Sequence, residues 1–304
     1  PARRSAIVSQ CLCVFGEVLF DHFPDGRRVL GGAPFNVAWH LQAFGENPLF
    51  LSRVGLDPEG DEVRAAMQRW GMSLQGMQSD EFLPTGRVVV SFEDGEPGYE
   101  IVRPAAWDAI LPPAQGADCR LLYHGSLALR SEQSRESWRA LRAAGDAMVF
   151  VDINLRPPWY ERSVLLEALD GARWVKLNGF ELDHLAPGKG KMHQRAAAFI
   201  EKYGLEGLIL THGAKGASVT MPGGAHFETR PEGDMEIKDT VGAGDALASV
   251  MILGLARGWP VQIALDRAQA FASAIVGRRG ATVGEPGFYD RFLADWKQRN
   301  LDAV

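Results

Sequence analysis

The sequence contains no long apolar run. None of its segments approaches the roughly 18 consecutive apolar residues that a membrane-spanning helix needs. Residues 1–5 carry charge but no apolar stretch, unlike a secretory signal peptide. We therefore expect neither a membrane anchor nor a membrane partner.

Positive charge is not in excess either. The chain has 32 Lys and Arg against 38 Asp and Glu, which gives a formal net charge of −6. Proteins that bind nucleic acids usually carry a basic domain or stripe, and no such segment is evident here. We therefore expect no nucleic-acid partner.

Cysteine is scarce, with three residues: Cys11, Cys13 and Cys119. A small, odd number argues against a disulfide framework and favours a reducing compartment. Cys11 and Cys13 would share one face of a strand, and no further metal ligands follow nearby. We expect three buried free thiols and a cytoplasmic protein.

What the sequence does have is an alternation of two patterns. Apolar runs of strand length alternate with helical patterns, several of which start at Pro or end at Gly. This alternation predicts an α/β protein with a mainly parallel sheet that helices cover on both faces. Strands are predicted at 11–15, 49–51, 121–124, 148–151, 174–177 and 208–211, a hairpin at 218–229, and helices at 34–44, 58–70, 131–144, 163–169, 179–185, 193–203, 243–256, 260–276 and 287–297.

One region departs from the alternation. Residues 87–92 and 99–102 flank the turn-rich segment 94–98 and read as a hairpin. Together with the strand-like residues 27–30 they predict a small β appendage. Val88 and Val90 are alternate residues and would give it one apolar face.

The strongest chemical signal is the segment Asp-Thr-Val-Gly-Ala-Gly-Asp-Ala at 239–246, which precedes an apolar helix pattern. Glycines at a helix start expose N–H groups to an anion, which the helix dipole also favours. A carboxylate beside that anion can accept a proton from a hydroxyl group. This combination is typical of phosphoryl transfer, although on the local pattern alone Asp245 can equally be a helix cap.

The segment resembles the second signature of the ribokinase-like carbohydrate kinases of the phosphofructokinase B type, within them the fructokinase-like branch. Five further motifs stand in the family's order, at 31–38, 55–60, 152–156, 178–181 and 211–216. The resemblance covers essentially the whole chain. It implies one catalytic domain over 1–304, a three-layer α/β/α fold, and a small β-sheet lid formed by about 21–33 and 84–108.

The resemblance also implies roles on the acceptor side of the site. Asp245 would be the catalytic base, and the N–H groups of Gly242, Ala243 and Gly244 would form the anion hole. The residues that would bind the sugar are Asp21, Gly32, Asn36 and Arg156. Taken alone, Asn36 can be a polar residue near a helix N-terminus and Arg156 a member of a surface salt bridge.

On the nucleotide side, Thr211, Gly213 and Gly216 match the motif that approaches ATP. Asn178 and Glu181 would position Mg²⁺, largely through water, although an Asn-x-x-Glu is also a common helix cap. Asp239 would help to bind a monovalent cation such as K⁺, together with the loop at 278–281. The lid would close over the sugar and exclude water, and in this family it often mediates a homodimer.

The expected activity is ATP-dependent phosphorylation of a small sugar, fructose-like by branch. The alternatives are a 2-keto-3-deoxygluconate, ribose or nucleoside kinase of the same family, or a sugar-binding regulator without catalysis. Residues 157–160, Pro-Pro-Trp-Tyr, depart from the family pattern near the sugar and leave the substrate open. Leu247 and Val250 also depart from it, at helix-packing positions.

Overall fold

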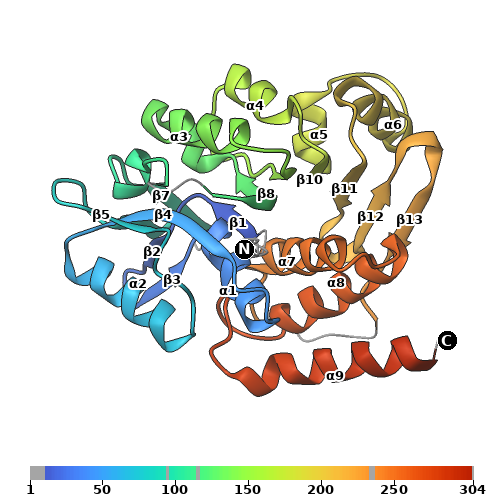
Figure 1. The fold of residues 1–304 in the computed structure, drawn as a ribbon. Coiled ribbons are helices and arrows are strands. Elements are labelled where there is room, and N and C mark those ends of the chain that lie inside the picture. The colour runs from blue at the N-terminus through green and yellow to red at the C-terminus, as the bar shows by residue number, and fades with distance from the viewer. Residues whose placement is uncertain (1–10, 94–95, 114–116, 233–236, 303–304) are drawn as a thin grey trace, which may run out of the picture.

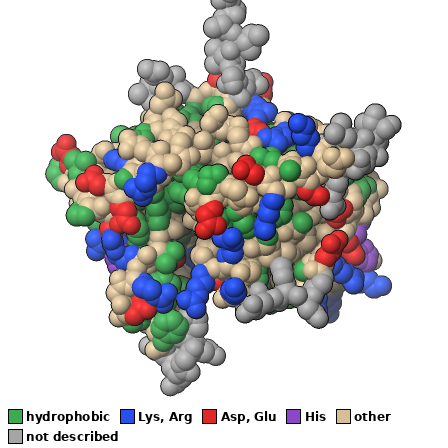
Figure 2. All heavy atoms as spheres, turned by 90° about the horizontal axis from the view of Figure 1, so that it is seen from below, with side chains coloured by type: hydrophobic (Ala, Val, Ile, Leu, Met, Phe, Trp, Pro, Cys, Tyr) green, Lys and Arg blue, Asp and Glu red, His purple; other side chains and the backbone are tan. Residues whose placement is uncertain are grey.

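The computed structural model describes residues 11–93, 96–113, 117–232 and 237–302 (Figure 1). Residues 1–5, for which no secretory signal is predicted, and Asp94 and Gly95 in the hairpin turn lie outside them. Within the described ranges no helix combines the length and the apolar character needed to cross a membrane. Figure 2 shows one face of the molecule, on which acidic and basic side chains are interspersed.

A large sheet forms the centre of the described chain. Its order is β13-β12-β11-β10-β9-β8-β1-β4-β5, and all neighbours pair in parallel except β11 with β12 and β12 with β13. The inner strands are mostly apolar and buried, as expected for strands that helices cover on both faces. The strands are β1 (Cys11–Phe15), β4 (Leu49–Gly55), β5 (Met77–Asp80), β8 (Cys119–Gly125), β9 (Met148–Asp152), β10 (Trp174–Asn178), β11 (Gly207–Thr211), β12 (Ala217–Thr220) and β13 (His226–Thr229).

Two helical layers enclose this sheet (Figure 1). One core cluster joins the sheet to α1, α2, α7, α8 and α9, and a second joins its other face to α3, α4, α5 and α6. The predicted three-layer α/β/α architecture is therefore confirmed. The helices are α1 (Ala33–Ala43), α2 (Pro58–Arg69), α3 (Glu132–Ala143), α4 (Arg162–Leu169), α5 (Gly179–Leu185), α6 (Met192–Tyr203), α7 (Ala243–Ala256), α8 (Val261–Val276) and α9 (Pro286–Asp302), with 3₁₀ turns η1 (Ala106–Ala109), η2 (Leu127–Arg130), η3 (Gly213–Lys215) and η4 (Pro222–Gly224).

The lid is a separate four-stranded sheet in the order β3-β2-β6-β7. It consists of β2 (Leu19–His22), β3 (Arg28–Gly31), β6 (Gly86–Glu93) and β7 (Glu96–Ile101). Val88 and Val90 are buried, so the apolar face that they share packs inward at this end of the hairpin. Phe92 and Tyr99 continue that face toward the turn, because Tyr99 pairs with Val90, and both are more than half exposed, at 56% and 61%.

Two strands are absent from the sequence-based prediction. β2 follows β1 after a short break and belongs to the lid, so its four residues join a sheet different from that of the strand before them. β5 is a short edge strand with the sequence Met-Gln-Ser-Asp, which lacks an apolar run. Neither carries the pattern by which strands are recognised.

The prediction of three free thiols is wrong. Cys13 and Cys119 form a disulfide, with their Cα atoms 5.8 Å apart, and only Cys11 is a free thiol among the described residues. The reason is the parallel pairing of β1 with β8, in which Cys11 lies opposite Cys119. Residues 106 positions apart in the chain thus become neighbours, which a count of cysteines cannot reveal.

Candidate active site

The candidate site lies beyond the carboxyl ends of the parallel strands. The chain continues from β1 to β4 and β5 on one side, whereas β8 to β11 follow on the other, so the strand order reverses between β1 and β8. In open α/β sheets ligands bind at such a point. The residues found there are Glu17 after β1, Ser126 after β8, Asp152 at the end of β9, Asn178 at the end of β10 and Thr211 at the end of β11.

The N-terminus of α7 faces this edge. Gly242 is its N-cap with a φ of 80°, a left-handed conformation that favours glycine, and a Cβ there would lie 2.4 Å from the Cβ of Ala281. Among the described residues no backbone carbonyl accepts a hydrogen bond from the N–H of Gly242 or Gly244, and that of Ala243 makes one long bond, 3.4 Å, to Thr240. Backbone N–H groups at the predicted anion hole are therefore available to donate hydrogen bonds to an anion.

Asp245 lies in the first turn of α7, partly buried. Its Oδ2 accepts a 2.8 Å hydrogen bond from Nδ2 of Asn36, although 209 residues separate the two. Burial raises the pKa of the Asp245 carboxyl to about 6, against the hydrogen bond from Asn36, which lowers it. The structure thus brings together the predicted base and a predicted sugar ligand, and the Oδ1 of Asn36 is buried without a partner among the described residues.

A buried ion pair lies next to this helix start. Nζ of Lys176 donates to both carboxylate oxygens of Asp152, at 2.7 and 2.9 Å, and the hydroxyl of Tyr123 donates to Asp152 at 3.1 Å. A Cβ on Gly244 would lie 3.3 Å from that Nζ, so the ammonium adjoins the anion hole. Burial works to lower the pKa of Lys176, but the charge of Asp152 outweighs it and the pKa lies above its usual value.

Sequence reasoning missed Lys176, and the signal was present. A lysine within the apolar run Trp-Val-Lys-Leu of a buried strand has to find a partner, since buried ammonium groups are costly unless paired. The partner is set by register, because Lys176 lies opposite Asp152 in the pairing of β10 with β9. We therefore add Lys176 to the candidate site.

Glu17 is a second residue that was missed. It follows β1 directly, is 4% exposed, and its Oε2 has no hydrogen-bond partner among the described residues. Burial raises the pKa of its carboxyl to about 7; the charge of Asp245 adds to this, and those of Arg156 and Arg130 oppose it. The segment Gly-Glu-Val-Leu-Phe-Asp contains two acidic residues, and the sequence prediction used the second one, Asp21.

Asp21 lies on the lid, and Gly32 follows the lid strand β3 at the start of α1. Asp21 lies on β2, where burial raises the pKa of its carboxyl to about 6. Gly32 precedes α1 with a φ of 110°, and a Cβ there would lie 2.8 Å from the carbonyl oxygen of Glu17. Only glycine therefore allows the loop after β3 to lie this close to the loop after β1.

Arg156 follows β9 and is exposed. Its charge lowers the pKa values of both Asp245 and Glu17, so its guanidinium lies on the site's side of the loop. In the described part of the chain no carboxylate forms a salt bridge with it, and one Nη donates at 3.2 Å to the carbonyl of Leu155. The alternative interpretation of Arg156 as a surface salt-bridge residue has no support here.

Asn178 and Glu181 form a reciprocal cap of α5. The Glu181 N–H donates to Oδ1 of Asn178 at 2.9 Å, and the Asn178 N–H donates to Oε2 of Glu181 at 2.8 Å. The other oxygen of Glu181 accepts the N–H of Leu155 at 3.1 Å. Burial raises the pKa of this carboxyl. Both carboxylate oxygens are thus held in place by backbone donors, and Mg²⁺ usually keeps several waters beside the few protein carboxylates that it uses.

An open cleft of about 840 Å³ lies beside these residues. It is lined by Asn178 and Thr211 and by Lys215, which lies between the two predicted glycines, Gly213 and Gly216. Two exposed apolar side chains, Phe180 and Met192, also line it. Backbone, polar and apolar groups together suit a nucleotide.

Asp239 connects two loops through hydrogen bonds. Its Oδ1 accepts the N–H of Val241 at 3.0 Å and its Oδ2 accepts the N–H of Gly280 at 3.0 Å. The segment before α7 is thereby attached to the loop at 278–281. Asp239 therefore lies beside the loop with which the sequence prediction groups it in a monovalent-cation site.

Known proteins match this chain over most of its length. Residues 10–287 match the model of the pfkB family carbohydrate kinases. A fructokinase from Salmonella typhimurium is 32% identical over 305 residues, which cover 92% of this chain and 97% of that protein. The described site and this similarity agree in pointing to a sugar kinase.

Solved structures share the fold. A fructokinase from Xylella fastidiosa with bound ATP has a TM-score of 0.78 at 25% identity, covering 89% of this chain and 93% of its own. A double-mutant fructokinase from Vibrio cholerae O395, bound to fructose, ADP and potassium ion, has a TM-score of 0.77 at 24% identity, covering 90% and 94%. The chain belongs to the pfkB family carbohydrate kinases and is an ATP-dependent sugar kinase of the fructokinase-like kind.

Proposed function

We propose that the enzyme transfers the γ-phosphoryl group of ATP to a hydroxyl of fructose or a closely similar sugar, with Asp245 as the base. The observation that carries this proposal is at the start of α7, where the hydrogen bond between Asn36 and Asp245 lies beside the N–H groups of Gly242 and Gly244. Neither N–H group has a backbone acceptor in the described part of the chain. A carboxylate with a pKa of about 6 is ionised at neutral pH and accepts the proton of the attacking hydroxyl.

The acceptor side is assigned to the buried polar groups around Asp245. Asn36 holds the carboxylate with its amide N–H and has its oxygen left for a sugar hydroxyl. Asp21 and Gly32 lie on the lid side, and closure of the lid excludes the water that would compete as acceptor. In this scheme the sugar lies between the lid and the start of α7.

The nucleotide is assigned to the open cleft. Thr211 and the turn from Gly213 to Gly216 approach ATP, and the α7 N–H groups stabilise negative charge on the transferring group. The Lys176 ammonium adjoins the same helix start and adds positive charge there. Mg²⁺ supplies charge neutralisation between the phosphates when it is bound. Asn178 and Glu181 would orient its water shell, since Mg²⁺ keeps several waters and uses few protein carboxylates, and backbone N–H groups hold both side chains in place.

A monovalent cation is proposed at Asp239. Each of its oxygens accepts one backbone N–H, and a carboxylate has about four lone-pair positions, so acceptor capacity remains. The similar protein from Vibrio cholerae binds potassium ion. Because Asp239 joins the segment before α7 to the loop at 278–281, a cation there would stabilise the anion hole.

We propose a homodimer through the lid and a cytoplasmic location. Phe92 and Tyr99 share one face of the lid hairpin and are exposed, and exposed aromatic side chains are typical of interfaces. Light scattering on the intact protein and on a Phe92→Ser/Tyr99→Ser variant tests this, with a monomeric native protein as the contrary result. We propose the cytoplasm because a kinase that uses ATP needs a compartment that supplies it.

The substrate is tested by an ADP-release screen of hexoses, pentoses, sugar acids and nucleosides, with and without potassium. Fructose is expected to give the highest kcat/KM. Asp245→Asn is the control, which must abolish the signal with every sugar. ADP release that is independent of any sugar, or full turnover in this variant, would contradict the proposal.

A sugar acid such as 2-keto-3-deoxygluconate is the second candidate. The observation in its favour is the exposed Arg156 guanidinium, which has no carboxylate partner among the described residues and faces the site. If the acceptor is a sugar acid, Arg156→Gln raises its KM strongly and leaves that of a neutral sugar unchanged.

A further inference from the structure

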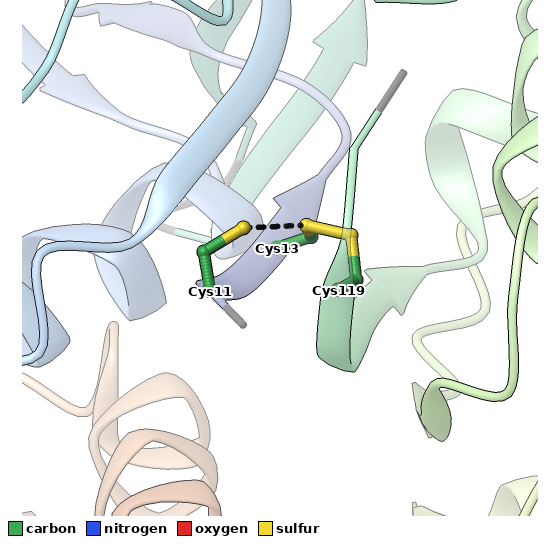
Figure 3. Close-up of side chains that lie close together, drawn as sticks. All are labelled: Cys11, Cys13 and Cys119. Carbon is green, nitrogen blue, oxygen red and sulfur yellow. Dashed lines mark hydrogen bonds between the residues drawn. A yellow bond between two sulfur atoms is a disulfide. The ribbon is translucent and has the colours of Figure 1, made fainter. Parts of the chain in front are cut away.

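Three sulfur atoms gather at the edge of the sheet opposite the active site. Cys11 begins β1 and Cys119 begins β8, whereas Cys13 is the third of the five residues of β1. Figure 3 shows their side chains converging, with the disulfide between Cys13 and Cys119 and the Cys11 sulfur beside it. The Sγ atoms of Cys11 and Cys13 are 3.5 Å apart. We call these three residues the sulfur cluster.

The spacing of the sulfur cluster suits a single metal ion. One ligand atom from each residue lies within 4.8 Å of the others. A metal with sulfur ligands at about 2.3 Å holds three thiolates about 4 Å apart in a trigonal plane. Cys11 is therefore already at a ligand distance from its neighbours. The bonded pair, Cys13 and Cys119, needs only to separate once the disulfide is reduced.

The surroundings of the cluster suit a soft ion. Cys13 is fully buried and Cys11 and Cys119 are half-buried, so the cluster is partly accessible to solvent. No His, Asp or Glu of the described chain joins the group as a further ligand. An all-thiolate set favours soft metals such as Cu(I), Zn²⁺ and Cd²⁺ over Mg²⁺ or Ca²⁺.

We propose that Cys11, Cys13 and Cys119, in their reduced form, bind one soft d¹⁰ metal ion as a three-thiolate site, and that the Cys13–Cys119 disulfide closes this site. Opening it takes two electrons from a dithiol reductant, which becomes a cyclic disulfide while Cys13 and Cys119 become thiols. Binding of the ion then releases the three thiol protons to solvent. A reducing compartment supplies reductants of this class.

The proposed site is independent of the kinase chemistry. The active-site residues follow the carboxyl ends of the same strands that begin at Cys11 and Cys119. A metal in the sulfur cluster would join the starts of β1 and β8, which pair in the middle of the sheet. Its expected effect is on the stability of the folded state, since an ion that binds only that state raises Tm.

Cadmium provides the direct test, because the chain has three cysteines and every cadmium–thiolate signal must come from them. The intact protein is reduced with a phosphine, the phosphine is removed, and Cd²⁺ is titrated without oxygen. We expect one Cd²⁺ per chain, a charge-transfer band with the amplitude of three thiolates, and a higher Tm. The oxidised protein is the matched control and should show none of these three results.

Cys11→Ser tests whether the third sulfur is a ligand. This variant should lose one third of the band and more than tenfold in cadmium affinity, given that removal even of outer-shell partners costs about 10- to 100-fold. Its rate of ADP release should equal that of the parent protein, which shows that it folds. Two or fewer thiolates per Cd²⁺, unchanged affinity in Cys11→Ser, or a disulfide that withstands the phosphine would each overturn the proposal.

Discussion

The two halves of the active site hold their charges in different ways. Around Asp245, the proposed base, three charged side chains are each less than a tenth exposed, and their charges are coupled to that of Asp245; they are Glu17, Asp152 and Lys176. In the nucleotide cleft the charged side chains, such as Lys215, are exposed. Charges in a buried group are coupled, because little water screens them, whereas exposed charges are screened and act almost singly.

This difference has a consequence for the two substrates. A buried set of charges is arranged before the sugar arrives and can stabilise charge that develops during transfer. An open, screened cleft contributes mainly to binding. Substitutions in the first half should therefore change kcat, the pH profile and the free energy of unfolding together, and those in the second should change only the KM for ATP.

The largest effect is expected for Asp245→Asn. The amide keeps the size of the side chain but cannot accept the sugar proton, so kcat should fall by about 10² to 10⁴. ATP binding, measured by calorimetry, should persist because the open cleft lies outside this group.

Asp266→Asn is the matched control, since Asp266 is an exposed aspartate on α8. It should leave kcat unchanged. Equal losses in the two variants would remove the basis for treating Asp245 as the base.

Lys176→Met should give the largest loss of stability. It leaves the Asp152 carboxylate buried with only the Tyr123 hydroxyl, and breaking a buried pair in this way costs about 3–5 kcal/mol in the free energy of unfolding. Denaturant unfolding measures it. Arg139→Met breaks the exposed pairs with Glu132 and Glu167 and should cost less, at about 0.2–1 kcal/mol for each pair.

The double variant Lys176→Met/Asp152→Leu sharpens the comparison. Removing both charges takes away the unpaired carboxylate, so stability should recover while kcat stays low. If kcat recovered as well, the ion pair would be structural and Lys176 would have no part in catalysis.

The residues of the site also show how much of it could be predicted from the sequence. Gly242, Ala243, Gly244 and Asp245 could be predicted because a helix start and its first turn form from consecutive residues. The predicted alternation of strands and helices rests on equally local patterns, and the three-layer fold followed from it. Local patterns thus predicted the motif-bearing loops and the order in which they stand along the chain.

The pairings between distant residues could not be predicted in this way. Lys176 meets Asp152, and Cys13 meets Cys119, only through the register and order of the strands. The same holds for the hydrogen bond from Asn36 to Asp245, although the resemblance had placed both residues in one site. Long-range pairing depends on which strands become neighbours, and no local pattern in this chain encodes it.

Gly242→Ala should have an intermediate effect. A left-handed conformation costs a residue with a Cβ about 1–2 kcal/mol, and this Cβ would also collide with Ala281. The helix start must therefore move, and kcat should fall with stability. Gly258→Ala is the control, because Gly258 has a φ of 67° but open space around its Cβ position. It should lose stability only; equal kcat values would show that the α7 start is not part of the transfer site.

A smaller effect is expected on the pH dependence of kcat/KM, and the pKa of Asp245 fixes its direction. The base must be ionised, so kcat/KM should fall as the pH drops below about 6, where Asp245 becomes protonated. Glu17→Gln should leave this fall where it is, because the Glu17 carboxyl, with a pKa of about 7, is already mostly protonated and uncharged where Asp245 titrates. Asn36→Ala removes the hydrogen bond that lowers the pKa of Asp245, so the fall should move to higher pH. An unchanged profile in Asn36→Ala, or a shift in Glu17→Gln as large as that in Asn36→Ala, would contradict this assignment.

The smallest effect is expected in the open nucleotide cleft, where the charged side chains are exposed. Lys215 lines the nucleotide cleft from the turn between Gly213 and Gly216, and its ammonium is screened by water. An exposed charge contributes about 0.2–1 kcal/mol, so Lys215→Met should raise the KM for ATP by at most about fivefold. The kcat, the pH profile and the unfolding free energy should stay as in the parent protein, and added salt should narrow the difference in KM. Steady-state assays at two salt concentrations measure this. A large loss of kcat in Lys215→Met would contradict this prediction. It would mean that the cleft closes around ATP and that Lys215 becomes buried and coupled to Asp245. The difference between the two halves of the site would then hold only for the open form.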